Sequence, residues 1–148
     1  MRRLLLLLIA VVGVSSLSIV PAPQAEAFGE TVGCIVSPMI DPVYRNNCRS
    51  TKPSTNYTAK FKVAHGSGTY SFNWSWYMTG AAAGPAYVVS GCTASNDYCW
   101  ISVPSDNCGD KTVVATVGII LNGRDEGVLN SSAHVFATCW LGTMLTWC

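Results

Sequence analysis

The chain has 148 residues, of which 49% are hydrophobic and only 11% are charged, and its formal net charge is +1. Such a chain lacks the clustered Lys and Arg that bind nucleic acids and anionic membranes, so we expect neither kind of partner. Its length, less the leader described next, fits one domain of ordinary size.

Residues 1–27 have the regions of a secretory signal peptide. Arg2 and Arg3 carry positive charge, residues 4–20 are apolar, and the segment ends in Ala25-Glu26-Ala27, the small-x-small pattern of a cleavage site. We therefore expect a secreted mature chain, residues 28–148, with no membrane span after processing. A membrane anchor is the alternative, because about 17 apolar residues approach the shortest possible span.

Residues 28–56 form a cysteine-bearing N-terminal arm. Turn residues such as Pro38, Pro42 and Asn46 predict an irregular or briefly extended backbone here. Residues 31–34 (Thr-Val-Gly-Cys) also resemble a bacterial lipobox, in which the cysteine is lipidated and anchors the protein to the cell surface. Thr31 replaces the usual aliphatic residue and a polar stretch separates Cys34 from the apolar run, so we expect secretion rather than a lipoprotein.

The clearest strand pattern lies in residues 70–78. Large apolar side chains occupy every second position of this segment: Tyr70, Phe72, Trp74, Trp76 and Met78. A period of two places them on one face of a strand that lines a core, and we expect Trp74 to be fully buried. Residues 57–63 alternate in the same way, and the Gly-rich turn between the two segments predicts a hairpin-like pair.

Four further segments predict strands: residues 86–90, 99–103, 112–121 and 128–138. Asn122-Gly123 is a strong signal for a tight turn, so the last two segments should form a hairpin. Residues 139–148 form an apolar tail that is too short to span a membrane. Short alternating segments at regular turn spacing predict an all-β, antiparallel β-sandwich of about seven strands.

All seven cysteines lie after residue 27, and in a small exported domain they predict a disulfide framework. The strand pattern favours three pairs, each closing a segment whose ends come together: Cys34–Cys48, Cys92–Cys99 and Cys108–Cys139. Cys148 then remains as a free thiol or as the link of a disulfide-bonded dimer. The main alternative is a Cys139–Cys148 pair, which would leave Cys108 without a partner.

Nothing in the sequence predicts catalysis, a cofactor or a metal site. The carboxylates lie mostly in predicted turns, where Asp usually bonds to the local backbone. Neither His65 nor His134 has a cysteine at zinc-ligand spacing or lies in a recognisable nucleophile motif. We therefore expect a protein that is not an enzyme and carries neither cofactor nor metal.

Candidate ligand contacts are the tryptophans that the predicted core does not account for, because indole faces stack on sugar rings and exposed aromatics mark recognition surfaces. These are Trp100, Trp140 and Trp147. Candidate glycosylation sites are the asparagines of three Asn-x-Ser/Thr sequons. These are Asn56, Asn73 and Asn130.

Residues 66–77, a Gly-rich turn followed by Tyr70-x-Phe72-x-Trp74, resemble the second-sheet strand of immunoglobulin-like domains, particularly PKD-type repeats. Residues 112–124 and 131–135 look like the final hairpin of such domains. The resemblance covers about residues 57–138 and implies an extracellular adhesion or interaction module, without naming a ligand. The chain departs from the immunoglobulin pattern because Phe61 or Val63 stands where the inter-sheet disulfide would need a cysteine.

We expect a secreted, non-catalytic interaction module whose partner is an extracellular protein or glycan. This expectation rests on the signal peptide, the disulfide-bonded β domain and the lack of a recognisable group of catalytic residues. The first alternative is a secreted hydrolase inhibitor that presents loop 93–98, pinned by Cys92 and Cys99, because a pre-organised loop loses little entropy on binding. The second alternative is a carrier of a small ligand or carbohydrate.

Overall fold

The computed structural model describes residues 29–40, 42–80, 85–105 and 109–148, and within these ranges the protein consists of strands and contains no helix. The signal peptide predicted for residues 1–27, as well as Phe28 and Cys108, lie outside the described residues. The described strands are β1 (Thr31–Ser37), β2 (Asn47–Arg49), β3 (Asn56–Ala64), β4 (Tyr70–Gly80), β5 (Tyr87–Gly91), β6 (Tyr98–Pro104), β7 (Lys111–Leu121), β8 (Arg124–Val135), β9 (Thr138–Leu141) and β10 (Met144–Trp147).

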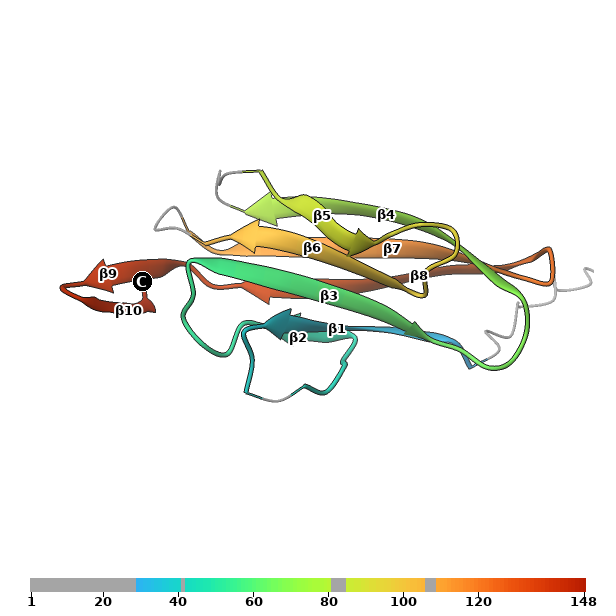
Figure 1. Ribbon diagram of the computed structural model, residues 1–148, viewed down its shortest axis with the longest axis horizontal. Helices are drawn as coiled ribbons and strands as arrows, with labels where there is room; N and C mark the ends of the chain where they lie inside the picture. The colour runs from blue at the N-terminus through green and yellow to red at the C-terminus, as the bar shows by residue number, and fades with distance from the viewer. Residues whose placement is uncertain (1–28, 41, 81–84, 106–108) are drawn as a thin grey trace, which may run out of the picture.

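The strands form a two-layer sandwich with a small hairpin at one end (Figure 1). One layer has the strand order β1-β3-β6-β5, and the other has the order β2-β8-β7-β4. All pairings are antiparallel except that of β2 with β8, which is parallel. The predicted all-β sandwich is therefore confirmed. The N-terminal arm is more regular than predicted, because it contributes the seven-residue strand β1 to one layer and the short strand β2 to the other.

The core lies between the two layers, and its side chains come from alternate positions of the strands. Phe61 of β3, Ile101 of β6 and Val113 of β7 are each fully buried. Each fully buried side chain of this kind contributes roughly 1.5–3 kcal/mol to folding by leaving water. The period-two pattern of the sequence thus marks the core-facing residues of both layers.

Tyr57 is also fully buried, and its hydroxyl is satisfied by the backbone next to β3. The hydroxyl donates to the carbonyl oxygen of Lys52 and accepts from the amide of Ser54, both at 2.8 Å. Burial raises the pKa of the Tyr57 phenol, because the ionised form would lose its hydration. Tyr57 therefore fixes the chain just before β3 as well as filling the core.

The prediction that residues 57–63 and 70–78 form a hairpin is wrong. β3 pairs with β1 and β6, whereas β4 belongs to the opposite layer and pairs with β7. Their connection therefore crosses from one layer to the other. Alternation shows only that both strands cover one core, and it does not distinguish two neighbours from two strands that face each other.

The prediction that Trp74 is fully buried is also wrong. β4 is the edge strand of its layer, so the inward side chains of Trp74 and Trp76 are only half-buried, and Phe72 is the buried aromatic of this strand. The indole of Trp74 donates from Nε1 to the carbonyl oxygen of Asn96 at 2.9 Å. Trp74 therefore closes the side of the sandwich rather than its centre.

The hairpin predicted for the last two long segments is confirmed. β7 and β8 are joined by Asn122-Gly123, whose φ angles of 50° and 81° are those of the primed turns that suit two-residue hairpins. The pairing shifts by one residue between Ile119 and Ile120, and the amide of Gly127 bonds to the carboxylate of Asp125 at 2.9 Å. This β-bulge lies beside the turn.

Two of the predicted disulfides, Cys34–Cys48 and Cys92–Cys99, are present. The predicted Cys108–Cys139 pair is wrong, and so is the free or intermolecular thiol at Cys148, because Cys139 and Cys148 bond to each other. The supposed apolar tail folds back at Gly142, where φ is +62°, so β9 and β10 pair and bring the two Cα atoms to 5.2 Å. The sequence of this short segment contains no turn motif as strong as Asn-Gly, so the second hairpin was not predicted.

Candidate functional site

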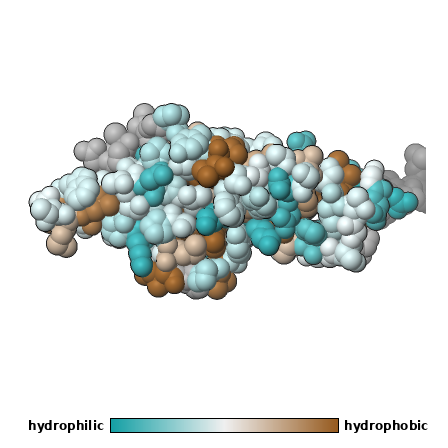
Figure 2. Space-filling view, viewed as in Figure 1, coloured by the Kyte–Doolittle hydropathy of each residue, from teal (hydrophilic) through white to brown (hydrophobic). Residues whose placement is uncertain are grey.

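A groove lies between the N-terminal arm and one end of the β2-β8 pair. It encloses about 720 Å³ and is lined by apolar and polar side chains: Ile35, Val36, Met39, Val43, Arg45, Asn47, Cys48, Arg49, Thr51, His134 and Phe136. Beside the groove, the Cys34–Cys48 disulfide joins β1 of one layer to β2 of the other. Figure 2 shows hydrophobic side chains on the arm, where Ile40 is 70% exposed and Val43 is 53% exposed.

A chain of hydrogen bonds joins a hydroxyl, an imidazole and a carboxylate at the border of this groove. His134 contacts Thr112 Oγ1 through Nδ1 at 3.0 Å and Asp110 Oδ2 through Nε2 at 3.3 Å. The sequence did not reveal a hydroxyl partner for His134, because Thr112 lies on the neighbouring strand. The His134 and Asp110 side chains are 39% and 49% exposed, so solvent reaches both groups. Asp110 also accepts from the amide of Ala137 at 2.8 Å, which anchors the strand end.

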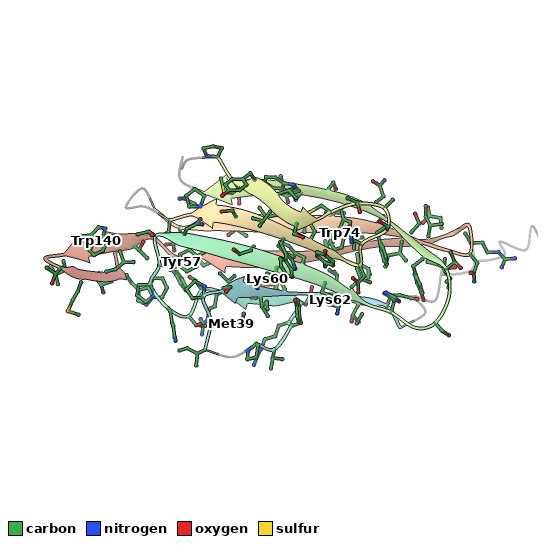
Figure 3. The ribbon with its side chains drawn as sticks, viewed as in Figure 1. Met39, Tyr57, Lys60, Lys62, Trp74 and Trp140 are labelled. Atoms are coloured by element: carbon green, nitrogen blue, oxygen red, sulfur yellow. A yellow bond between two sulfur atoms is a disulfide. The ribbon has the colours of Figure 1, made fainter. Side chains whose placement is uncertain are left out.

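The hairpin β9–β10 projects from the same end of the sandwich (Figure 1). Large apolar side chains are exposed on it: Trp140 is 65% exposed, Leu141 75% and Met144 70%. Figure 3 shows Trp140 on this projection, away from the body of the sandwich. Residues 138–148 include no charged side chain. We call Trp140, Leu141 and Met144 the hairpin tip.

The base of the hairpin is held more firmly than its tip. Thr138 is only 4% exposed, and its hydroxyl donates to the carbonyl oxygen of Ser54 at 3.1 Å. Trp147 packs edge-on against Phe136, with ring centroids 5.5 Å apart. These contacts and the Cys139–Cys148 disulfide present the hairpin tip on a fixed support.

The three tryptophans proposed as ligand contacts lie in two different places. Trp140 and Trp147 are on the hairpin, whereas Trp100 is on β6, in the layer β1-β3-β6-β5. The ammonium group of Lys60 lies over the Trp100 ring at 4.7 Å from its centroid, and the ring of Tyr98 is 5.2 Å away. One face of the Trp100 indole is therefore covered by a cation of its own chain.

Loop 93–98, proposed as an inhibitory loop, bonds to neighbouring strands. The carbonyl oxygens of Ala94, Asn96 and Asp97 accept from the Phe72 amide, the Trp74 indole and the Val63 amide respectively, at 2.8–2.9 Å. The loop is thus held in place, but its backbone carbonyl groups bond to the edge of β4 and to β3. The three sequon asparagines, Asn56, Asn73 and Asn130, are all exposed.

The outer face of the second layer carries no charge over its central area. Val113, Ala115 and Val117 of β7 point into the core, so the residues between them point outward, and the pairing register aligns their counterparts on β4 and β8. We call these outward residues the neutral face: Ser71, Asn73, Ser75, Tyr77, Thr79, Thr112, Val114, Thr116, Gly118, Ile120, Val128, Asn130 and Ser132. The sequence shows the alternation but not which strands lie side by side, so this face emerges only from the topology.

No protein-family model and no curated protein matches the chain. Within the part of the chain that the structure describes, no helix is long and apolar enough to cross a membrane. No group of three or more His, Cys, Asp and Glu side chains among the described residues is arranged to hold a metal ion. The three intramolecular disulfides are typical of proteins that fold outside the cytosol.

Proposed function

We propose that this protein is an exported, non-catalytic, immunoglobulin-like module that binds an extracellular protein through the hairpin tip. The observation that carries the proposal is the exposure of Trp140, Leu141 and Met144 on a disulfide-closed hairpin with a buried base. Tryptophan and methionine are enriched at protein–protein interfaces, and a large aromatic in the centre of a contact usually supplies much of the binding energy.

The strand order supports the immunoglobulin-like assignment. Constant-type immunoglobulin domains have the orders ABED and CFG, and β1-β3-β6-β5 and β4-β7-β8 follow these two orders when the strands are lettered along the chain and β2 is set aside. Trp74 then stands on the strand equivalent to C, which carries a core tryptophan in antibody domains. The disulfides join other positions than in antibodies, so the likeness concerns topology.

The edges of the hairpin suit a protein partner as well. Among the described strands, β9 and β10 pair with each other alone, so each has an outer edge that a partner strand can join. Burying Trp140, Leu141 and Met144 requires no dehydration of a charged side chain on the hairpin, because residues 138–148 include none. Export through the leader of residues 1–27 would bring this surface to the extracellular medium.

A site-specific cross-linking experiment tests the proposal. A photo-reactive amino acid replaces Met144 in one variant and Val128 in a control variant, since these side chains are 70% and 64% exposed but lie on different surfaces. Both proteins are incubated with intact producing cells and their medium. We expect one discrete protein adduct from position 144 that excess unlabelled wild type prevents and excess Trp140→Ser does not.

Equal labelling from positions 144 and 128, or equal competition by wild type and Trp140→Ser, would refute binding through the hairpin tip. Export is tested separately by the mass of the protein recovered from the medium. We expect the mature chain to begin at Phe28, and a protein that retains residues 1–27 would contradict that part of the proposal.

A further inference from the structure

The centre of the neutral face consists of rows of hydroxyl, amide and aromatic groups that include one aliphatic side chain, Val114. Ser75, Thr116 and Asn130 form one row across β4, β7 and β8, and Tyr77, Val114 and Ser132 form the next. Adjacent strands lie about 4.8 Å apart, so these side chains make a nearly continuous surface. Tyr77 is 57% exposed and is the aromatic side chain of this face.

Several polar groups on this surface have no bond to the protein itself. Among the described residues, the side chains of Ser75, Thr116 and Asn130 and the hydroxyl of Tyr77 make no hydrogen bond, whereas Ser132 bonds to Asn47. Each unbonded hydroxyl can donate and accept, and the amide of Asn130 offers both functions side by side. The neutral face can therefore both donate and accept hydrogen bonds to a ligand that has many hydroxyl groups.

The composition of the neutral face is the reverse of that of a protein interface. Protein interfaces have an apolar centre with a polar rim and are depleted in serine. Here hydroxyl and amide groups lie centrally around one aliphatic side chain, Val114, whereas Val128 and Ile120 lie toward the turn that follows β7. Among the described residues of this face, charged side chains and histidine stand at the two borders, with Arg49, Asp110 and His134 at one end and Arg124 and Asp125 at the other.

We propose that the neutral face binds an extended, uncharged polysaccharide. The exposed ring of Tyr77 stacks on one sugar, and Ser75, Thr116 and Asn130 bond to the hydroxyl groups of the next. An open surface of this width contacts a long chain at several sugars at once, whereas a single sugar would gain few contacts. The absence of charge on the central rows gives no attraction to acidic or basic polymers. This site is separate from the hairpin tip and does not depend on the function proposed for it.

Retention on insoluble polymers tests the proposal. The exported protein is produced in a host that adds no N-linked glycan, because Asn73 and Asn130 of this face are also sequon positions, and its mass is checked. It is titrated onto cellulose, chitin, β-1,3-glucan and starch, with alginate and chitosan as charged counterparts. We expect retention on at least one neutral polymer and on neither charged polymer.

Matched variants locate the site. Tyr87 is the control, since it is also 57% exposed but lies on β5 in the other layer. Tyr77→Ala should weaken retention by about tenfold or more, the effect of truncating a central aromatic contact. Tyr77→Trp should preserve it, and Tyr87→Ala should match the wild type. Asn130→Asp, which keeps the shape but loses the amide donors, should also weaken retention.

Three outcomes would overturn the proposal. The first is that no neutral polymer retains the wild type, and the second is that folded Tyr77→Ala binds as well as Tyr87→Ala. The third is a wild-type dimer that Tyr77→Ala converts to a monomer, which would assign the neutral face to a second copy of the chain. Circular dichroism of each variant establishes that it is folded.

Discussion

The hairpin tip and the neutral face are both exposed and uncharged, yet they differ in chemistry. The hairpin presents Trp140, Leu141 and Met144 on a narrow projection, whereas the neutral face spreads Tyr77 and several hydroxyl and amide groups over three strands. Apolar side chains gain most by entering an apolar pocket, whereas hydroxyl groups gain only when each finds a partner. Absence of charge alone therefore does not define a binding surface, and the remaining groups decide what it can bind.

The two surfaces also have different supports. The strands of the neutral face line the main core with their other side, so the face is as rigid as the sandwich. The hairpin is held through its base, by Thr138, Trp147 and the Cys139–Cys148 disulfide. Substitutions in the core should thus affect both surfaces, whereas substitutions at the hairpin base should affect the hairpin alone.

The largest effect on the free energy of unfolding is expected from Phe61→Ala, which should disrupt both surfaces by destabilising the core. Phe61 is fully buried between the layers, and truncating a buried phenylalanine costs roughly 3–5 kcal/mol through lost burial and the cavity left behind. Urea denaturation measures the free energy of unfolding. Trp74→Ala is the comparison, and it should lower the free energy of unfolding by less than Phe61→Ala does, because Trp74 is only half-buried. Equal losses would contradict the edge position of Trp74.

The next effect is expected from Tyr57→Phe, which should loosen the hairpin base more than the neutral face. The substitution removes the hydroxyl that bonds to Lys52 and Ser54, and losing these part-buried hydrogen bonds should cost about 0.5–1.5 kcal/mol. Ser54 in turn accepts from Thr138 at the hairpin base. Hydrogen exchange should therefore rise at residues 138–147 and stay unchanged in β7.

Tyr57 also predicts a dependence on pH. Its pKa is raised in the folded protein, so its contribution to stability is complete below the unfolded value of about 10 and is lost as the pH rises through the folded pKa. The hydrogen bond to Glu30 raises the pKa of Tyr70 as well, so the wild type has a second such group. Unfolding free energies at neutral and alkaline pH should converge between wild type and Tyr57→Phe. If the difference in unfolding free energy between wild type and Tyr57→Phe grew with pH, the raised pKa of Tyr57 would be contradicted.

A smaller global effect is expected from replacing Cys139 and Cys148 together with serine. The hairpin contacts the sandwich mainly through its base, so the global free energy of unfolding should fall by no more than about 1 kcal/mol, while local opening becomes frequent. Amide protection of β9 and β10 should fall selectively, and polysaccharide retention should be unchanged. Loss of protection in β7 or β8 would show that the hairpin supports the neutral face.

The smallest effect is expected from Lys60→Ala on the opposite layer. The substitution removes the cation above Trp100 and should cost about 0.5–1 kcal/mol. It also uncovers an indole on a face where the central hydroxyl, that of Ser102, is buried and bonded to Asn56, unlike the unbonded hydroxyl and amide rows of the neutral face. If these rows are needed besides an aromatic ring, retention on a neutral polymer should not increase. A marked increase would mean that an exposed ring is sufficient.

The sequence predicted the features that local chemistry determines. Period two marked the core-facing residues of β3 and β7, Asn122-Gly123 predicted the β7–β8 turn, and two disulfides followed from short loops. Features that depend on which strands are neighbours were missed. The half-burial of Trp74 follows from the edge position of β4, and the alignment of Ser75 with Thr116 and Asn130 follows from pairing between distant segments.

The hairpin β9–β10 was missed for a related reason. Residues 139–148 are apolar almost throughout, so they show no alternation, and Gly142 alone does not specify a turn. The sequence allows a Cys139–Cys148 pair as the alternative, but the strand pattern favours Cys108 as the partner of Cys139 because these two cysteines flank the long hairpin. The exposure of Trp140 depends on this fold-back and could not be predicted without it.

The separation of the two binding surfaces is tested most directly by one crossed comparison. Tyr77→Ala and the triple variant Trp140→Ser, Leu141→Ser, Met144→Ser are each measured for retention on the neutral polymer that binds the wild type and for competition in the cross-linking experiment. We predict that Tyr77→Ala loses retention but still competes, and that the triple variant is retained but no longer competes. If either folded variant loses both activities, or neither, the two surfaces are not the separate binding sites described here.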